Sequence, residues 1–454
     1  MVAAGERLVF PAAEHTPRPE RPAQDPLVHQ MGSEAPAGAD NVALLRESGL
    51  VVTIEHDLDP HLDRAIELIN GTAHLNDIAP HLPENIENAR AELRRMLAGH
   101  AVHAGILRVR DRHGDHGYCG LYIMHSGNTA SKLRYFCFSA RIADMGVEAW
   151  LYRRLGRPVL NVRADKMPAF VHDAREIDWV SLELPESAPR AGTDTHVPHY
   201  VYIRGTSDLR AVGHYFNLVA GAMYGDFNSV EDGVALPLHH STLARHALMG
   251  LPPMAAQLFG QLGYQSRHFQ SAVSQLPERG RAIWLLNFWG DPAYALYRHN
   301  GSGRTIPVVL PNFHRHLMDL TQLDPAKTGI GSDILRILKN RFTFAGMIGA
   351  DEFKENVRLI LQHATPETRV FILLSGESTS ANSAGKVKNK AMVNGWLTEL
   401  AGELPIISLL NIGDFVAPGE ETSSPNQIDR KVYFRIYQEI MRRLQFDTQQ
   451  AAAE

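Results

Sequence analysis

Residues 199–219, HYVYIRGTSDLRAVGHYFNLV, decide the fold expected for the second half of the chain. The opening HYVYIR is apolar enough for a buried strand, GTSDL has the small and polar residues of a tight turn, and the remainder continues as a helix. Further apolar runs follow at 282–287, 304–310, 369–375 and 405–411, with helical stretches between them. This alternation predicts a largely parallel sheet covered by helices on both faces.

The first half of the chain predicts a different order of elements. Apolar residues recur at helical spacing in 62–69 and again in 89–97. Three strand-like runs follow, at 101–109, 118–125 and 133–139. A turn then leads into a helix over 140–156, ARIADMGVEAWLYRRLG. This order of two helices, an antiparallel meander, a turn and a helix resembles that of acetyltransferases of the GNAT superfamily.

The composition excludes several classes of protein. The chain has 454 residues and a net charge of −5, which does not favour broad binding to nucleic acid or to an anionic membrane. No apolar run is long enough for a transmembrane helix or for the core of a signal peptide. Two cysteines, Cys119 and Cys137, are too few for a disulfide framework and indicate small buried side chains. We therefore expect a cytoplasmic protein.

The turn at 139–148, SARIADMGVE, is the stretch of the first half that points to a ligand. Backbone N–H groups at a strand-to-helix turn can bind an anion, helped by the helix dipole, and glycine lets the backbone approach it closely. In the GNAT superfamily the corresponding turn holds the pyrophosphate of acyl-coenzyme A. The resemblance assigns this role to Arg141, Ala143, Met145, Gly146 and Val147, unless the turn only shapes the start of a helix.

Three ordered motifs make the resemblance more specific. The segments LINGTAHLN (68–76), DRHGDHGYCG (111–120) and FSARIADMGVE (138–148) resemble motifs of the acetyltransferase-like module of FkbH-type biosynthetic proteins. Asp144 stands where that pattern has its first glycine, and Ala140 replaces its usual cysteine. The chain has no Asp-x-Asp-x-Thr/Val motif of the dehalogenase-like domain that handles glyceryl loading in that family, so this chemistry is not expected here.

The turn GTSDL resembles the first block of SGNH-type hydrolases, in which a serine after the first strand is the nucleophile. The resemblance assigns this role to Ser207 and the role of an oxyanion donor to Asn287. These enzymes carry an Asp-x-x-His pair before the final helix, but Ser424 and Gln427 stand at those positions here, and glutamine cannot accept a proton at neutral pH. We consider His299 as a substitute base, with His314 and His316 as alternatives, or a binding role for the turn without catalysis.

Other polar clusters are less informative. Asp291, Arg298 and His299 lie in an aromatic stretch that follows a strand and could line a pocket, although an aromatic flank of the core explains the stretch equally well. No set of histidines and carboxylates has the spacing of a metal site on one helix face, so no metal is expected.

The sequence predicts an α/β protein with a flexible proline-rich leader (1–42), a GNAT-like domain with a mixed, mainly antiparallel sheet (43–185), a linker (186–198), an SGNH-like three-layer α/β/α domain with a parallel, flavodoxin-type sheet (199–446) and a short tail (447–454). The leading hypothesis is an acyltransferase of secondary-metabolite biosynthesis. Its donor would be acyl-coenzyme A or a phosphopantetheine thioester on an acyl carrier protein, and its acceptor a small molecule. The alternatives are an esterase that uses Ser207 and a non-catalytic protein that docks a carrier protein.

Overall fold

The computed structural model describes most of the chain in fourteen stretches. They are 39–71, 80–99, 101–126, 130–160, 162, 167–172, 175–183, 198–231, 234–236, 239–310, 316–324, 332–376, 384–417 and 429–451. Within them the protein is an α/β structure with one mixed sheet in the N-terminal region, residues 39–183, and one parallel sheet in the C-terminal region, residues 198–451.

The N-terminal region is built on a six-stranded sheet in the order β5-β4-β3-β2-β1-β6. Its strands are β1 (Leu50–Glu55), β2 (Val102–Asp111), β3 (Gly114–Ser126), β4 (Ser131–Phe138), β5 (Val159–Leu160) and β6 (Val180–Glu183). Its helices are α1 (Ala39–Ser48), α2 (Leu62–Gly71), α3 (Ile86–Leu97), α4 (Val147–Arg154) and α5 (Ala169–His172). The two predicted helices and the three predicted strands of the meander are confirmed as α2, α3 and β2 to β4.

Apolar side chains cover both faces of this sheet. One face packs on α2 and α3, and the other on α4 and the segment around Trp179. Cys119 and Cys137 are buried and free, as expected, and they belong to the cores on opposite faces. Strands β1 to β4 pair antiparallel, whereas β5 runs parallel to β4. The chain between β4 and β5 therefore crosses over through the turn at 139–148 and α4.

The C-terminal region contains a five-stranded sheet in the order β16-β15-β11-β7-β8, and every pair in it is parallel. Its strands are β7 (Tyr200–Gly205), β8 (Ala222–Phe227), β11 (Ala282–Leu286), β15 (Thr368–Leu374) and β16 (Ile407–Asn411). The helices α7 (His240–Met249), α11 (Ala350–Leu361) and α12 (Ala384–Glu403) pack on one face, and α6 (Arg210–Asn217) and α13 (Arg430–Ala451) pack on the other. The predicted parallel sheet with helices on both faces is confirmed.

One predicted strand does not belong to this sheet. The run at 304–310 forms only β13 (Thr305–Pro307), which pairs antiparallel with β12 (Leu296–His299). Together with β14 (Phe342–Gly346) these strands make a separate three-stranded sheet, next to α8 (Pro253–Gly260) and α10 (Ser332–Arg341). The parallel sheet takes β8 as its edge strand instead. Because β8 is only half-buried and contains Gly225 and Asp226, it has no continuous apolar run by which to find it.

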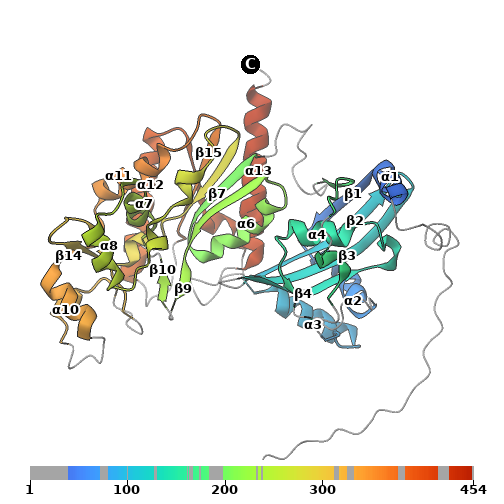
Figure 1. Ribbon diagram of the computed structural model, residues 1–454, viewed down its shortest axis with the longest axis horizontal. Helices are drawn as coiled ribbons and strands as arrows, with labels where there is room; N and C mark the ends of the chain where they lie inside the picture. The colour runs from blue at the N-terminus through green and yellow to red at the C-terminus, as the bar shows by residue number, and fades with distance from the viewer. Residues whose placement is uncertain are drawn as a thin grey trace, which may run out of the picture.

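The two regions are joined by polar contacts along α6 and α13, which lie between the two sheets (Figure 1). Arg430, at the start of α13, is almost fully buried and donates hydrogen bonds to the backbone oxygens of Leu97 (2.9 Å) and His56 (3.2 Å). On the other side, the Arg154 side chain donates to Leu218 O at 2.6 Å. We call this contact between the regions the seam.

Candidate functional site

The two central strands β7 and β11 end side by side at a point where the chain order of the sheet reverses. From β7 the chain continues to β8 on one side of the sheet, and it later returns to β11 on the other side. In open α/β sheets, ligands bind at the carboxyl ends of the strands next to such a switch point. The residues that leave these two strands are Thr206 and Ser207 after β7 and Asn287 after β11.

The structure brings Asn287 directly against the turn that carries Ser207. Asn287 is fully buried, its Oδ1 accepts a hydrogen bond from Thr206 N at 3.2 Å, and its Nδ2 donates to Thr206 Oγ1 at 2.9 Å. A Cβ atom built on Gly205 would lie 2.5 Å from Asn287 Oδ1, and Gly205 has φ of +154°, so this close approach requires glycine. Both polar atoms of the Asn287 amide are bonded to Thr206, so the side chain of Asn287 holds the turn in place.

Ser207 is exposed and begins a short 3₁₀ turn, Ser207–Leu209, that leads into α6. The adjacent Asp208 accepts a hydrogen bond from the hydroxyl of Tyr433 on α13. Burial, and then the nearby Asp208 carboxylate, raise the pKa of Tyr433, so its hydroxyl stays protonated. The turn is therefore fixed from two sides, by Asn287 and by Tyr433, while Ser207 itself is exposed.

The candidate bases for Ser207 make their contacts elsewhere. His299 Nδ1 lies 2.8 Å from Ser302 Oγ, and its ring packs on Phe342 in the small antiparallel sheet. The ring of His316 packs on Tyr294. His314, Ser424 and Gln427 lie outside the described residues. Among the described residues, no histidine forms a hydrogen bond with Ser207.

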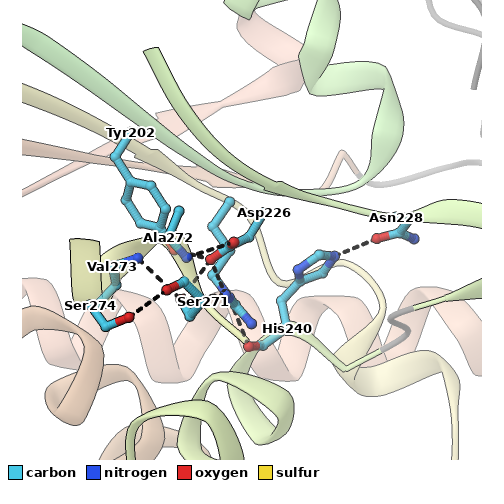
Figure 2. A network of polar contacts seen from close by, with 9 residues as sticks. Tyr202, Asp226, Asn228, His240, Ser271, Ala272, Val273 and Ser274 are labelled. Carbon is cyan, nitrogen blue, oxygen red and sulfur yellow. Dashed lines mark hydrogen bonds and ion pairs between the residues drawn. The ribbon is translucent and has the colours of Figure 1, made fainter. Parts of the chain in front are cut away.

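A buried polar network lies beneath this edge of the sheet, at the ends of β7 and β8 (Figure 2). The Arg204 guanidinium, 2% exposed, forms an ion pair with Asp226 at 2.5 Å and donates to His240 O at 2.9 Å. Asp226 also accepts hydrogen bonds from Ser271 Oγ and Tyr202 Oη at 2.6 and 2.8 Å. This network is not predicted from the sequence, and the signal for it is Arg204 within an apolar strand.

His240 is the histidine of this network. Its Nε2 lies 2.6 Å from Asn228 Oδ1, and its Nδ1 is buried without a hydrogen-bond partner among the described residues. Burial, and then the positive charge of Arg204, hold the pKa of His240 well below its usual value. Because the ring is fully buried and hard to protonate, it supports the edge of the sheet rather than acting as an accessible base.

The polar residues of the aromatic stretch are not gathered into one pocket. Asp291 is fully buried and accepts hydrogen bonds from the backbone of His240 (2.9 Å) and Ser241 (3.1 Å), so it caps the start of α7. Burial raises the pKa of Asp291, although nearby His239 and these hydrogen bonds act to lower it. Arg298 is exposed on β12, and the structure gives it no contact with Asp291.

The second candidate site is the turn between β4 and α4. A 3₁₀ turn, Ala140–Ile142, is followed by two residues with left-handed backbone, Asp144 (φ +64°) and Gly146 (φ +80°). The N–H groups of Ile142, Ala143 and Met145 are already bonded to carbonyl oxygens within the turn. Gly146 stands at the N-cap of α4 and has no side chain to cap the helix, and the N–H groups of Gly146 and Val147 have no acceptor among the described residues.

Trp179 restricts access to this turn on one side. Its Nε1 donates to Met145 O at 2.9 Å, and a Cβ atom built on Gly146 would lie 3.0 Å from its ring. Arg141, Ala143 and Asp144 remain exposed on the open side, whereas Val147 is buried in the core. The turn therefore offers one accessible face, on which Arg141 and Asp144 have opposite charges.

Comparison of the chain with protein-family models, with curated proteins and with solved structures gave no match.

Two further observations limit the chemistry of the described residues. Within the described stretches, no group of three or more His, Cys, Asp or Glu side chains is placed to hold a metal ion. No helix in the same part of the chain is both long and apolar enough to cross a membrane. The last part of the motif LINGTAHLN, residues 72–76, lies outside the described residues, as does the proline-rich segment up to residue 38.

Proposed function

We propose that the protein is a cytoplasmic acyltransferase of secondary-metabolite biosynthesis, in which the turn at 139–148 binds the pyrophosphate of acyl-coenzyme A or the phosphate of a carrier-protein phosphopantetheine. The observation that carries this proposal is the parallel pair of β4 and β5, joined through a glycine turn and a helix whose N-terminus is uncapped. The acceptor is a small molecule, and this region is a GNAT-like, FkbH-related module.

The local geometry supports a phosphate ligand. The N–H groups of Gly146 and Val147 lie at the start of α4, where the positive end of the helix dipole favours an anion. Pairing between β4 and β5 extends over Lys132↔Val159 and Leu133↔Leu160, so the turn lies beyond the paired part of the strands. In this proposal Arg141 pairs with a phosphate oxygen, and Gly146 with Val147 supplies backbone donors. Asp144 opposes binding by charge repulsion.

Equilibrium binding of coenzyme A, measured by calorimetry, tests this proposal. Arg141→Ala removes a cation from the turn and is expected to weaken binding about tenfold, whereas Asp144→Gly removes the opposing carboxylate and is expected to strengthen it. Arg134→Ala is the matched control, because Arg134 is an exposed arginine on β4 and its loss changes the net charge equally. Equal affinities for all four proteins, or no binding by any, would contradict the proposal.

A second candidate function is ester hydrolysis or deacylation by the C-terminal region through Ser207. It is favoured by the contact of Asn287 with the turn at the switch point of a sheet whose strand order, by position along the chain, is 2-1-3-4-5. That order and the serine turn support an SGNH-like fold of flavodoxin type. In this reading the Ser207 hydroxyl attacks the carbonyl carbon while an unassigned base accepts its proton. The bond to the alcohol or thiol breaks, this group leaves with a proton, and water then hydrolyses the acyl-serine ester to release the acid.

The mass of the intact protein after incubation with a fluorophosphonate probe tests this second candidate. Covalent labelling of the wild type and not of Ser207→Ala would support an activated serine. An unlabelled wild type, or equal labelling of both proteins, would remove the hydrolase function and leave donor binding by the N-terminal turn to be judged by the calorimetry.

A further inference from the structure

Arg210 is the first residue of α6 and stands three positions after Ser207. Its guanidinium lies over the ring of Phe227, with Cζ 5.1 Å from the ring centroid. Phe227 ends β8 and pairs in register with Gly205, the residue that opens the Ser207 turn. The guanidinium is therefore held at the carboxyl edge of the sheet, beside the turn that carries Ser207.

Arg210 is only partly buried, and it differs from the buried arginines Arg204 and Arg430 in having no hydrogen-bond acceptor among the described residues. Its Nε is buried without a hydrogen-bond partner, and no carboxylate of the described residues forms an ion pair with it. Arg204, by contrast, is bonded to Asp226, Ser271 and the backbone of His240. Arg430 likewise donates to two backbone oxygens at the seam. Native proteins rarely leave buried charged donors unpaired, because such groups lose their hydration without compensation.

The neighbouring acid does not satisfy this guanidinium. Asp208 lies between Ser207 and Arg210 in the chain, but its carboxylate accepts the hydroxyl of Tyr433. Burial lowers the pKa of Arg210, and no neighbouring carboxylate acts against that effect. Arginine keeps its charge even so, because its reference pKa is far above neutral. The start of α6 thus holds a partly buried guanidinium three positions after the exposed residue Ser207.

We infer that Arg210 binds an oxyanion, the carboxylate or phosphate group of a ligand that lies against Ser207. A guanidinium presents parallel N–H donors that match both kinds of anion, and contact with an aromatic face orients it. The ligand of the C-terminal region is therefore acidic, and an acyl substrate would carry its negative group near the start of α6. The inference rests on the proposal that the Ser207 turn is a ligand site, and it does not require that Ser207 reacts.

Calorimetric titration of the full chain with inorganic phosphate and, separately, with succinate tests this inference. The wild type and Ser207→Ala are expected to bind at least one of the two anions, and the stronger one identifies the phosphate or the carboxylate as the natural group. Arg210→Gln is expected to lose about 10- to 100-fold in affinity, and Arg298→Gln, which removes an exposed arginine of the small sheet, is expected to lose none.

Thermal unfolding without ligand separates binding from a structural role. Arg210→Met retains much of the side-chain volume and removes the unpaired donor, so its melting temperature is expected to equal or exceed that of the wild type. A marked fall in this temperature, or equal anion affinity of Arg210→Gln and the wild type, would overturn the inference. So would the absence of anion binding to the wild type. Failure of fluorophosphonate labelling would not, because it concerns only the reaction of Ser207.

Discussion

Gly146 combines two constraints at a single residue. Its backbone has φ of +80°, and its Cα faces the ring of Trp179 so closely that a Cβ atom would lie 3.0 Å from it. Gly156 has nearly the same backbone, φ +81°, but nothing lies within 4 Å of the place where its Cβ would be. The two glycines therefore separate the cost of a left-handed backbone from the cost of the close approach.

Alanine at each of these positions is expected to destabilise the protein to a different extent. Gly156→Ala should lower the free energy of unfolding by about 1 kcal/mol, which is the cost of the left-handed backbone alone. Gly146→Ala should lower it by about 2 kcal/mol or more, since the ring of Trp179 must also move. Urea unfolding followed by circular dichroism measures both values. Equal losses would show that Trp179 does not restrain the turn.

The sequence predicts the residues of a candidate site only where they are close to one another in the chain. Gly146 and Arg141 were found because the residues of the turn are neighbours in the chain. Trp179 lies 34 positions from Met145, and Tyr433 lies 225 positions from Asp208, so neither contact leaves a pattern in one sequence. Asn287 lies against the turn that carries Ser207, because two parallel strands that are neighbours in a sheet end together, although the amide of Asn287 bonds to Thr206.

At the scale of elements, strands with a continuous apolar run were predictable, and the half-exposed or very short edge strands were not. Such runs identify the central strands β7, β11 and β15 and also the edge strand β16. The edge strand β8 has a half-exposed surface, and β5 has only two residues. The run at 304–310 was wrongly predicted to join the parallel sheet, because apolar composition does not reveal whether a strand pairs parallel or antiparallel.

The start of α13 links two elements that the sequence could not relate. Arg430 donates to backbone oxygens at the end of α3 and after β1, and Lys431 forms an ion pair with Asp59. Tyr433, about one helical turn further on, bonds to Asp208 beside Ser207. The same helix end therefore supports the seam and the Ser207 turn.

Removing the Arg430 guanidinium is expected to weaken the seam. Arg430→Ala leaves two carbonyl oxygens without their donor and opens a buried space, so the free energy of unfolding should fall by about 2–4 kcal/mol. Arg442→Ala, on the exposed part of the same helix, should cost under about 1 kcal/mol, because its partner Glu439 is also at the surface. Denaturant unfolding compares the two variants. A similarly small loss for both would show that Arg430 contributes little to the seam.

At the scale of the whole molecule, a buried group of aromatic rings and histidines fills the seam. His103 and His214 stack with ring centroids 4.4 Å apart, and Tyr122 Oη lies 2.9 Å from His214 Nε2. His56 packs on Tyr215 at 4.9 Å and on Phe434 at 5.4 Å. Burial lowers the pKa of His56 to about 4. A hydrogen bond with Ala104 O acts to raise this pKa, and the positive charge of Arg430 acts to lower it.

These histidines make the stability of the protein depend on pH. His56 stays neutral in the folded protein down to pH of about 4, whereas in the unfolded chain it takes up a proton below about 6.5. The unfolded state therefore binds more protons between these values, and stability falls as the pH falls through this window. The pKa of His214 is also held well below its usual value, first by burial and then by His103, His56 and Arg430, so His214 acts in the same direction.

Replacement of His56 is expected to reduce this dependence. Between pH 7 and pH 5 the loss of unfolding free energy should be smaller by about 2 kcal/mol in His56→Gln than in the wild type. His363→Gln, at an exposed histidine, should leave the loss unchanged. Urea unfolding at the two pH values gives the difference. An equal loss in His56→Gln and the wild type would show that His56 is not held neutral at the seam.

A contact at the seam also shows where the two candidate turns lie relative to each other. Helices α4 and α6 meet near their C-terminal ends, where Asn217 Nδ2 donates to Arg154 O at 3.0 Å. The proposed donor turn precedes α4, and the Ser207 turn precedes α6, so each turn lies at the end of its helix away from this contact. The two turns are therefore separate sites, and the binding of coenzyme A at the first can be measured without any reaction at the second.

Amide hydrogen exchange across residues 144–149, with and without coenzyme A, tests the central proposal most directly. The N–H groups of Gly146 and Val147 have no acceptor among the described residues, so they should exchange quickly in the free protein and become protected when a pyrophosphate binds to them. Protection confined to this stretch, and greater in Asp144→Gly, is the predicted result. Unchanged exchange there at millimolar coenzyme A, or protection only around Ser207, would contradict the proposed donor site.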